Sequence, residues 1–226
     1  MKVFWGFDPG GKGKFGWAVC IGGDDGLTVL DTGIADHAKG AMECVLKVTP
    51  KEKPIAGAGI DAPMFWVFDE GREADRLVRA AIKRLGARSP GGTVQHFNSL
   101  RGACFIQGLL VLKLLRQLYS NLPVTESHPK ALLWLMGIAR KGYEPELVRP
   151  DDIMEINFKD SGFGLEDERD AILGAFTAWA MIRRRSDWVD LLEYEKKGRI
   201  LAGELPIGYW LPNNSISERT VIIDQP

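Results

Sequence analysis

Two short apolar segments near the start of the chain, separated by a glycine-rich turn, constrain the fold most strongly. Residues 3–7 and 15–21 are apolar and rich in aromatic side chains, a composition typical of β-strands. We therefore expect a β-hairpin whose first strand ends at Asp8. A carboxylate at the end of an apolar strand is costly to bury without a cation or hydrogen-bond donors. Asp8 is the first candidate functional residue, although Asp-Pro-Gly is also a common turn sequence.

Two later segments are also predicted to be strands that end in an acid. Residues 55–60 lead to Asp61, and residues 123–126 end at Glu126. Ligands of open α/β sheets bind outside strand ends, so these acids and Asp8 are expected to share a site. A simpler interpretation of Asp61 is a turn residue before a proline. His128 could bind a metal, carry a proton or contact phosphate, and a lone histidine at a helix start is also often a structural hydrogen-bonding residue.

A fourth group of acids begins the helix predicted over residues 166–182. Asp167 and Asp170 are three residues apart and share a face of its first turn. Acids are common in first turns because they cap the helix and favour its dipole, without any chemistry. That explanation accounts less well for Asp170, which lies at the edge of the apolar part of the helix.

The remaining pattern predicts one domain, residues 1–226, with a largely helical insertion over about 70–121 and a loosely attached tail over about 213–226. The length and the 45% hydrophobic content suit one globular domain. A third strand is expected over 27–34, and residues 89–98 and 142–160 are expected to be mainly loop, with a short helix from Pro150. The other expected elements are helices over 36–48, 71–86, 100–119 and 129–138, and a strand or hairpin within 198–208.

Charge and composition limit the classes of function that the chain can have. The net charge of −1 argues against a protein that coats nucleic acid non-specifically, but residues 72–116 carry nine basic and two acidic side chains. The side chains expected to contact substrate phosphates are Lys12, Arg72, Arg76, Arg79 and His128. Three scattered cysteines and the lack of a signal peptide or a membrane-spanning segment predict a cytoplasmic protein.

The acids together predict a metal site. Like charges are kept together mainly where divalent cations neutralise them. Carboxylate ligands favour Mg²⁺ or Mn²⁺ over zinc, and two such ions about 4 Å apart can promote phosphodiester cleavage. The predicted metal ligands are Asp8, Asp61, Glu126, Asp167 and Asp170.

Five pieces of the sequence carry a resemblance to a known family. In order, they are Gly6-Phe7-Asp8 to Gly16-Trp17, Ile60 to Pro63, the helix with Arg72, Asp75, Arg76 and Arg79, Glu126 to Pro129, and Asp167 with Asp170-Ala171. In these pieces the chain resembles the domain of unknown function 429 family, whose members are predicted RNase H-like nucleases. The resemblance runs in family order from residue 3 to residue 182, although Lys130 stands where the family often has an acid. It implies an α/β fold with an RNase H-like mixed sheet, whose first three strands form a meander, and helices on both faces. It also implies that Asp8, Asp61, Glu126 and Asp170 are catalytic.

The sequence therefore predicts a metal-dependent nuclease acting on DNA or RNA. Two alternatives stay open. The first is a nucleotide-binding or phosphotransfer protein of the actin-like or sugar-kinase type, which would use the glycine-rich turn to hold phosphates; those proteins duplicate the fold, and 226 residues leave room for one copy. The second is a non-catalytic binding module on the same fold.

Overall fold

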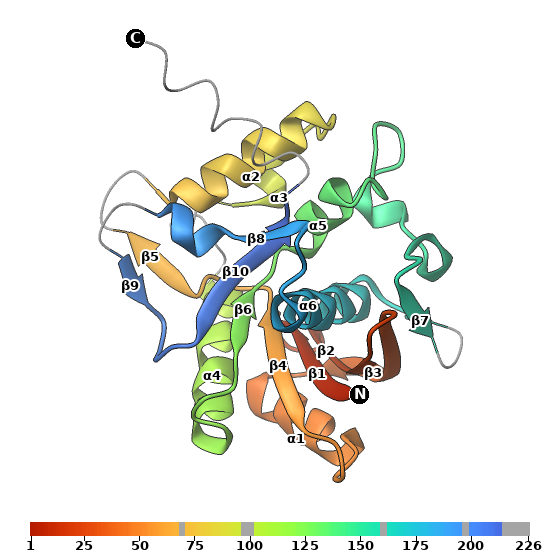
Figure 1. Cartoon of the computed structure of the whole chain (residues 1–226), viewed down its shortest axis with the longest axis vertical. Coiled ribbons are helices and arrows are strands. Elements are labelled where there is room, and N and C mark those ends of the chain that lie inside the picture. The colour runs from red at the N-terminus through yellow and green to blue at the C-terminus, as the bar shows by residue number, and fades with distance from the viewer. Residues whose placement is uncertain (68–70, 96–101, 159–161, 196–198, 214–226) are drawn as a thin grey trace.

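An eight-stranded mixed sheet with helices on both faces forms the centre of the molecule (Figure 1). We describe it from a computed structural model, in which residues 1–67, 71–95, 102–158, 162–195 and 199–213 are placed. The strand order is β7-β3-β2-β1-β4-β6-β10-β8. The protein is thus an α/β protein, as the sequence predicts.

The first three strands are antiparallel neighbours: β1 (Lys2–Asp8), β2 (Phe15–Gly22) and β3 (Leu27–Ala35). On the other side of β1, the strands β4 (Ile55–Ile60), β6 (Val124–Glu126) and β10 (Ile207–Pro212) follow one another in parallel. The edges are β7 (Ile156–Phe158), parallel to β3, and β8 (Trp188–Asp190), antiparallel to β10. The C-terminal ends of β1, β4 and β6 therefore point the same way.

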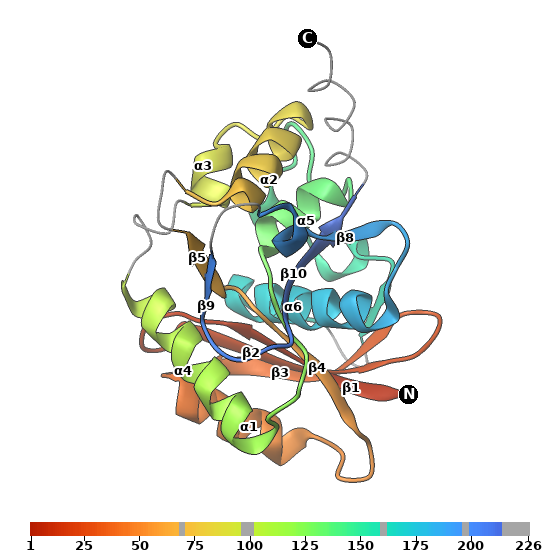
Figure 2. The same cartoon turned by 60° about the vertical axis from the view of Figure 1, so that its left-hand side comes forward.

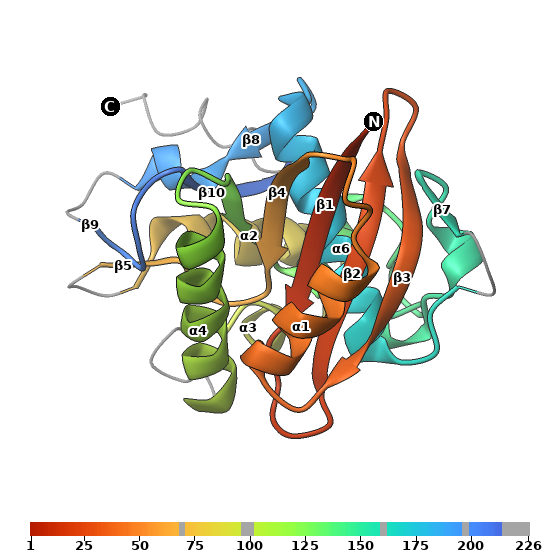
Figure 3. The same ribbon diagram turned by 90° about the horizontal axis from the view of Figure 1, so that it is seen from below.

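Alternating side chains of the strands form two hydrophobic cores, one on each face. On one face, Trp5 and Phe7 pack with α1 (Ala38–Val48) and α4 (Gly102–Leu118). On the other face, Phe4 packs with α6 (Glu166–Arg183). Figure 2 shows α1 and α4 on the opposite side of the sheet from α6, and Figure 3 looks onto α1 and α4 in front of the strands. The period-two alternation of β1 is the physical reason for the two cores.

Three glycines let α6 lie directly on the sheet. A Cβ atom at Gly6 of β1 would stand 1.7 Å from the carbonyl oxygen of Ala171, so only glycine fits there. In the same way, a Cβ atom at Gly16 would stand 1.9 Å from the carbonyl oxygen of Asp167, and one at Gly59 would stand 1.9 Å from that of Gly174. These contacts fix the first turn of α6 against the end of the first hairpin.

The remaining elements surround the ends of the strands. They are β5 (Phe65–Val67) paired with β9 (Arg199–Leu201), α2 (Glu73–Arg84), α3 (Pro90–Thr93), α5 (Pro129–Leu135), and the 3-10 turns η2 (Pro145–Leu147), η3 (Pro150–Asp152) and η4 (Leu191–Tyr194). The described part of residues 70–121 is largely helical, and residues 214–226 of the predicted tail lie outside the described residues. None of the described helices is both long and apolar enough to cross a membrane.

The structure corrects the expected elements in a few places. The region expected to be a loop before residue 96 contains α3, and the region 142–160 contains the edge strand β7. The strands β5 and β8, of three residues each, were also not predicted from the sequence. Such short strands carry too few residues to show an alternating pattern, and partners far along the chain hold them in place.

Candidate active site

The ends of two parallel strands bring Asp8 and Asp61 together. Phe7 of β1 pairs with Ile60 of β4, so the next residues, Asp8 and Asp61, are neighbours across the sheet. The backbone N–H of Asp61 donates to the carbonyl oxygen of Phe7 at 2.9 Å, which fixes this register. Both acids have the same side-chain direction as Gly6 and so face α6, as the pleat of a strand requires.

The first turn of α6 adds Asp167 and Asp170 to these acids. The contact between Gly16 and the oxygen of Asp167 holds this turn beside Asp8, which pairs with Gly16 in the hairpin. The charges of Asp61, Asp167 and Asp170 all act on Asp8. We call Asp8, Asp61, Asp167 and Asp170 the acidic cluster.

Burial and mutual repulsion raise the pKa values of the carboxyl groups in the acidic cluster. Burial, followed by the charges of Asp61, Asp170 and Asp167, raises the pKa of Asp8 well above its usual value. Burial raises the pKa of Asp61 to about 6, even though His128 opposes the shift. Burial also raises the pKa of Asp170 to about 7, against the effect of Arg169. Arg169 and Lys130 offset only part of the effect of burial on the pKa of Asp170.

These shifts predict how stability depends on pH when no metal ion is bound. The carboxyl group of Asp170 has a higher pKa in the folded state than in the unfolded state. The stability that it contributes is therefore complete below the unfolded pKa of 3.8 and is lost as the pH rises through the folded pKa of about 7. We expect the melting temperature in EDTA to fall between pH 5 and pH 8, and Asp170→Asn to reduce this fall. Thermal unfolding at several pH values measures it.

The native protein and Asp170→Asn are compared because His128 also makes stability fall as the pH rises. The pKa of His128 is raised in the folded state, so the stability that it contributes is lost above its ordinary pKa of 6.5. His128 contributes to both curves, and their difference isolates the carboxyl group. Parallel curves for the native protein and Asp170→Asn would contradict the prediction.

Glu126 lies near the acidic cluster but belongs to a separate buried network. Ile60 pairs with Glu126 in the sheet, so Ser127, and not Glu126, occupies the position level with Asp61. The Glu126 carboxylate accepts from Arg72 at 2.6 and 2.7 Å and from the Met64 backbone N–H at 2.9 Å. Burial alone would raise its pKa, but Arg72 and His128 lower it to about 2. The negative charge of Glu126 is thus compensated by Arg72 and His128.

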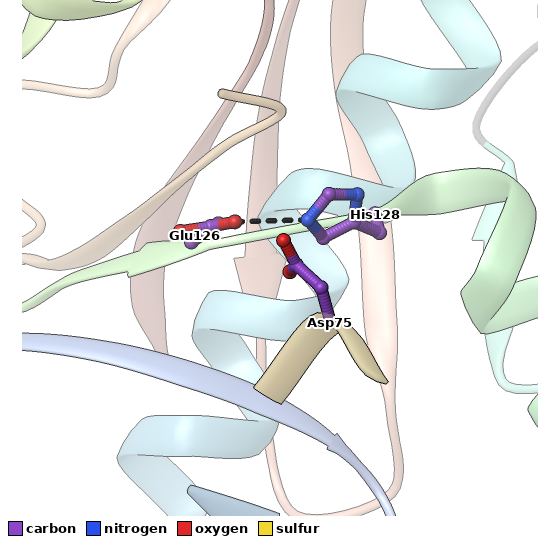
Figure 4. Close-up of side chains that lie close together, drawn as sticks. All are labelled: Asp75, Glu126 and His128. Carbon is purple, nitrogen blue, oxygen red and sulfur yellow. Dashed lines mark hydrogen bonds and ion pairs between the residues drawn. The ribbon is translucent and has the colours of Figure 1, made fainter. Parts of the chain in front are cut away.

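Asp75 and His128 complete this network (Figure 4). Arg72 donates to Asp75 at 2.7 and 2.9 Å, and Nε2 of His128 lies 2.8 Å from Glu126. Ligand atoms of Asp75, Glu126 and His128 lie within 4.8 Å of one another, a spacing that could suit a metal ion. The guanidinium of Arg72 already supplies positive charge to both carboxylates, so Asp75, Glu126 and His128 do not need a metal ion.

The arginines and the lysine that were predicted to contact phosphate differ in how far they are exposed to solvent. Arg72 is 2% exposed and pairs with two carboxylates, so it lies buried rather than on the surface, and its role as a phosphate contact stays a prediction. Arg79 is half-buried and donates to the Val94 carbonyl at 3.2 Å. Arg76 is half exposed and pairs with Glu73, and Lys12 is exposed in the hairpin turn. Arg76 and Lys12 are the predicted contacts that solvent reaches most freely.

His128 connects the network to the acidic cluster. Its Nε2 faces Glu126, whereas its Nδ1 lies 4.0 Å from an Asp61 oxygen. The side chain is 11% exposed and its ring packs against Tyr209. Glu126 therefore fixes the orientation of His128 toward Asp61.

Three further polar residues lie at the site, and none of them was predicted from the sequence to act there. Arg169 donates to Asp170 at 2.6 and 2.8 Å, and the Lys130 charge acts on Asp8, Asp61 and Asp170. Ser127 is fully buried and its hydroxyl has no hydrogen-bond partner among the described residues. Two signals were available in the sequence: Arg169 is a basic residue within an acidic turn, and Lys130 stands where the resembled family often has an acid. The position of Ser127 depends on strand register, which the sequence does not reveal.

The chemistry of the acidic cluster suits a hard divalent cation. Every charged donor in it is a carboxylate oxygen, and oxygen ligands are those that Mg²⁺ and Mn²⁺ prefer. A cation there would lower the repulsion that raises the pKa values of Asp8 and Asp170. Asp8, Asp61 and Asp170 are the residues best placed to hold it.

Comparison of the chain with protein-family models, with curated proteins and with solved structures found no match.

Proposed function

We propose that this protein is a metal-dependent hydrolase that cleaves phosphodiester bonds in nucleic acid, on an RNase H-like fold. The observation that carries the proposal is the convergence of three acids with raised pKa values: Asp8 and Asp61 at the ends of parallel strands, and Asp170 in the first turn of α6. Buried acids that repel one another are characteristic of functional sites. The antiparallel first three strands and the helices on both faces agree with the resemblance noted in the sequence.

In this proposal Asp8, Asp61 and Asp170 hold Mg²⁺ or Mn²⁺. Such an ion polarises a phosphoryl oxygen and lowers the pKa of a bound water. Arg169 holds one oxygen of Asp170 by two hydrogen bonds and so fixes the orientation of this carboxylate. Glu126 positions His128 beside Asp61 and does not itself serve as a ligand.

The exposed cations around the strand ends would contact the nucleic-acid backbone. Lys12 and Lys14 are exposed in the turn that follows Asp8, and the charge of Lys14 acts on Asp167. Arg76 is an exposed arginine of α2. Contacts of this kind bind phosphates without reading the base sequence.

The test is cleavage of labelled single-stranded DNA, duplex DNA, RNA and an RNA–DNA hybrid, with Mn²⁺ or with EDTA. We expect cleavage of at least one substrate that requires the metal ion. Stable Mn²⁺ binding without cleavage of any substrate would contradict the proposal and favour a binding module. The four substrates also separate DNA from RNA specificity.

A further inference from the structure

Two partly exposed aromatic side chains, Trp66 of β5 and Phe105 of α4, lie against each other outside the hydrophobic cores. Their ring centroids are 5.4 Å apart, and the rings meet edge to face. Neither side chain belongs to either of the two cores that the described residues form. Phe65 and Val67 are buried, so the alternation of β5 turns Trp66 away from the core. We call Trp66 and Phe105 the aromatic pair.

The packing of α4 places the aromatic pair beside the C-terminal ends of β1 and β4. A Cβ atom at Gly108 of α4 would stand 2.4 Å from the Cβ atom of Ala62 and 3.7 Å from the Cγ atom of Pro9. Pro9 and Ala62 directly follow the two acids of these strand ends, so α4 lies against the strand ends at Gly108. Phe105 lies one turn earlier on α4, and side chains three residues apart on a helix are neighbours, about 5–6 Å from each other.

The surface around the aromatic pair combines apolar side chains with positive charge. Ile200 of β9 pairs directly with Trp66 and is 49% exposed. Arg199, which precedes it, is exposed, and Lys12 is exposed in the hairpin turn after Pro9. Figure 2 shows β5 and β9 beside α4. Unpaired bases present flat apolar faces and their phosphates carry negative charge, so a single-stranded nucleic acid matches this surface in both respects.

We propose that the aromatic pair stacks against unpaired bases of single-stranded DNA or RNA, whose backbone passes the acidic cluster. The inference rests on the proposed function and names its substrate class, a single strand. The bases of a duplex are already stacked and paired, so their faces are not open to Trp66. The aromatic pair thus determines specificity and takes no part in the cleavage step.

A different role for the aromatic pair would be structural only, since it connects β5 to α4. Leucine in place of Trp66 keeps an apolar contact with Phe105 but offers no flat ring, whereas phenylalanine keeps the ring. A structural role is therefore largely preserved in Trp66→Leu, while a stacking role is preserved only in Trp66→Phe. The order of the three affinities for a single strand separates stacking from packing.

The experiment is fluorescence anisotropy of labelled oligonucleotides of about 12 nucleotides, in EDTA so that metal-dependent cleavage does not occur. The probes are single-stranded DNA, RNA of the same sequence and the DNA duplex, all at one salt concentration. We expect the native protein to bind at least one of the single strands about tenfold more tightly than the duplex. Trp66→Leu should bind that strand about tenfold more weakly than the native protein, and Trp66→Phe should stay within about threefold of it.

Tyr119→Leu is the matched control for these variants. Tyr119 is partly exposed, meets Trp5 edge to face, and lies at the other end of α4 from Phe105. We expect its single-strand affinity to equal that of the native protein. An equal loss in Tyr119→Leu and Trp66→Leu would show a general effect of removing an aromatic side chain and would overturn the inference.

The outcomes distinguish this inference from the proposed function. Equal single-strand affinities of the native protein and Trp66→Leu, tighter binding of the duplex, or no binding of any probe would overturn the stacking role. A native dimer that Trp66→Leu converts to a monomer in sedimentation would also overturn it, because the aromatic pair would then pack against a second copy of the chain. Absence of metal-dependent cleavage by the native protein would refute the proposed hydrolase and leave the stacking role in place.

Thermal unfolding shows whether Trp66→Leu is folded. If it is not, ultraviolet cross-linking of the native protein to single-stranded DNA that contains iodouracil decides. We expect the base to attach to Trp66 or Phe105, and attachment at neither residue would overturn the inference.

Discussion

Asp8→Asn is expected to abolish metal-dependent cleavage while the chain stays folded. Asp8 lies at the centre of the acidic cluster, and burial and three neighbouring acids raise its pKa. Asparagine keeps the size of the side chain but removes the charge that attracts a divalent cation. Metal ions stabilise transition-state charge by several kcal/mol, so the cleavage rate should fall by about 10³ or more. The assay is the cleavage rate at saturating Mn²⁺.

The same substitution should leave the metal-free protein at least as stable as the native protein. Removing one of several repelling carboxylates lowers the free energy of the folded state at neutral pH. The rise in melting temperature that Mn²⁺ gives to the native protein should be lost, because the ion stabilises only a folded state that binds it. Asp25→Asn is the matched control, since Asp25 is exposed in the turn between β2 and β3. Undiminished cleavage by Asp8→Asn would refute the site.

Arg72→Met is expected to destabilise the fold by about 3–5 kcal/mol, since it leaves two buried carboxylates without their cation. Arg72 and Asp75 are 2% and 1% exposed, and Glu126 is fully buried. The guanidinium also lies over the Phe65 ring, 4.5 Å from its centroid. Chemical denaturation at pH 7 measures the change in the free energy of unfolding.

Arg76→Met gives the matched control for this experiment, because Arg76 lies one turn further along α2 and is half exposed. Its pair with Glu73 is a surface ion pair, so we expect a change within about 0.5 kcal/mol. A similar small effect of both substitutions would show that Arg72 is not the centre of a buried network. Its predicted role as a phosphate contact would then deserve a new test.

Much of the fold could be predicted from the sequence because its main elements carry strong patterns. The hairpin of residues 3–21 and the apolar helix after residue 166 lie within a few residues of β1, β2 and α6. The strand ends at Asp8 and Asp61 were predicted for the same reason. The RNase H-like assignment and the family resemblance stay predictions, which rest on the residues themselves.

The roles of Glu126 and Arg72 could not be derived from the sequence. Whether Glu126 or Ser127 lies level with Asp61 depends on strand register, and a shift of one residue turns a side chain to the other face. Arg72 is one of many basic residues between 72 and 116, and its partner Glu126 is 54 residues away. A pattern of local charge cannot show which arginine is buried.

The proposed metal site is tested most directly by anomalous diffraction from crystals of the native protein soaked in Mn²⁺. We predict a peak in the anomalous map in contact with carboxylate oxygens of Asp8, Asp61 and Asp170. A peak among Asp75, Glu126 and His128, or no peak at the acidic cluster, would contradict the account.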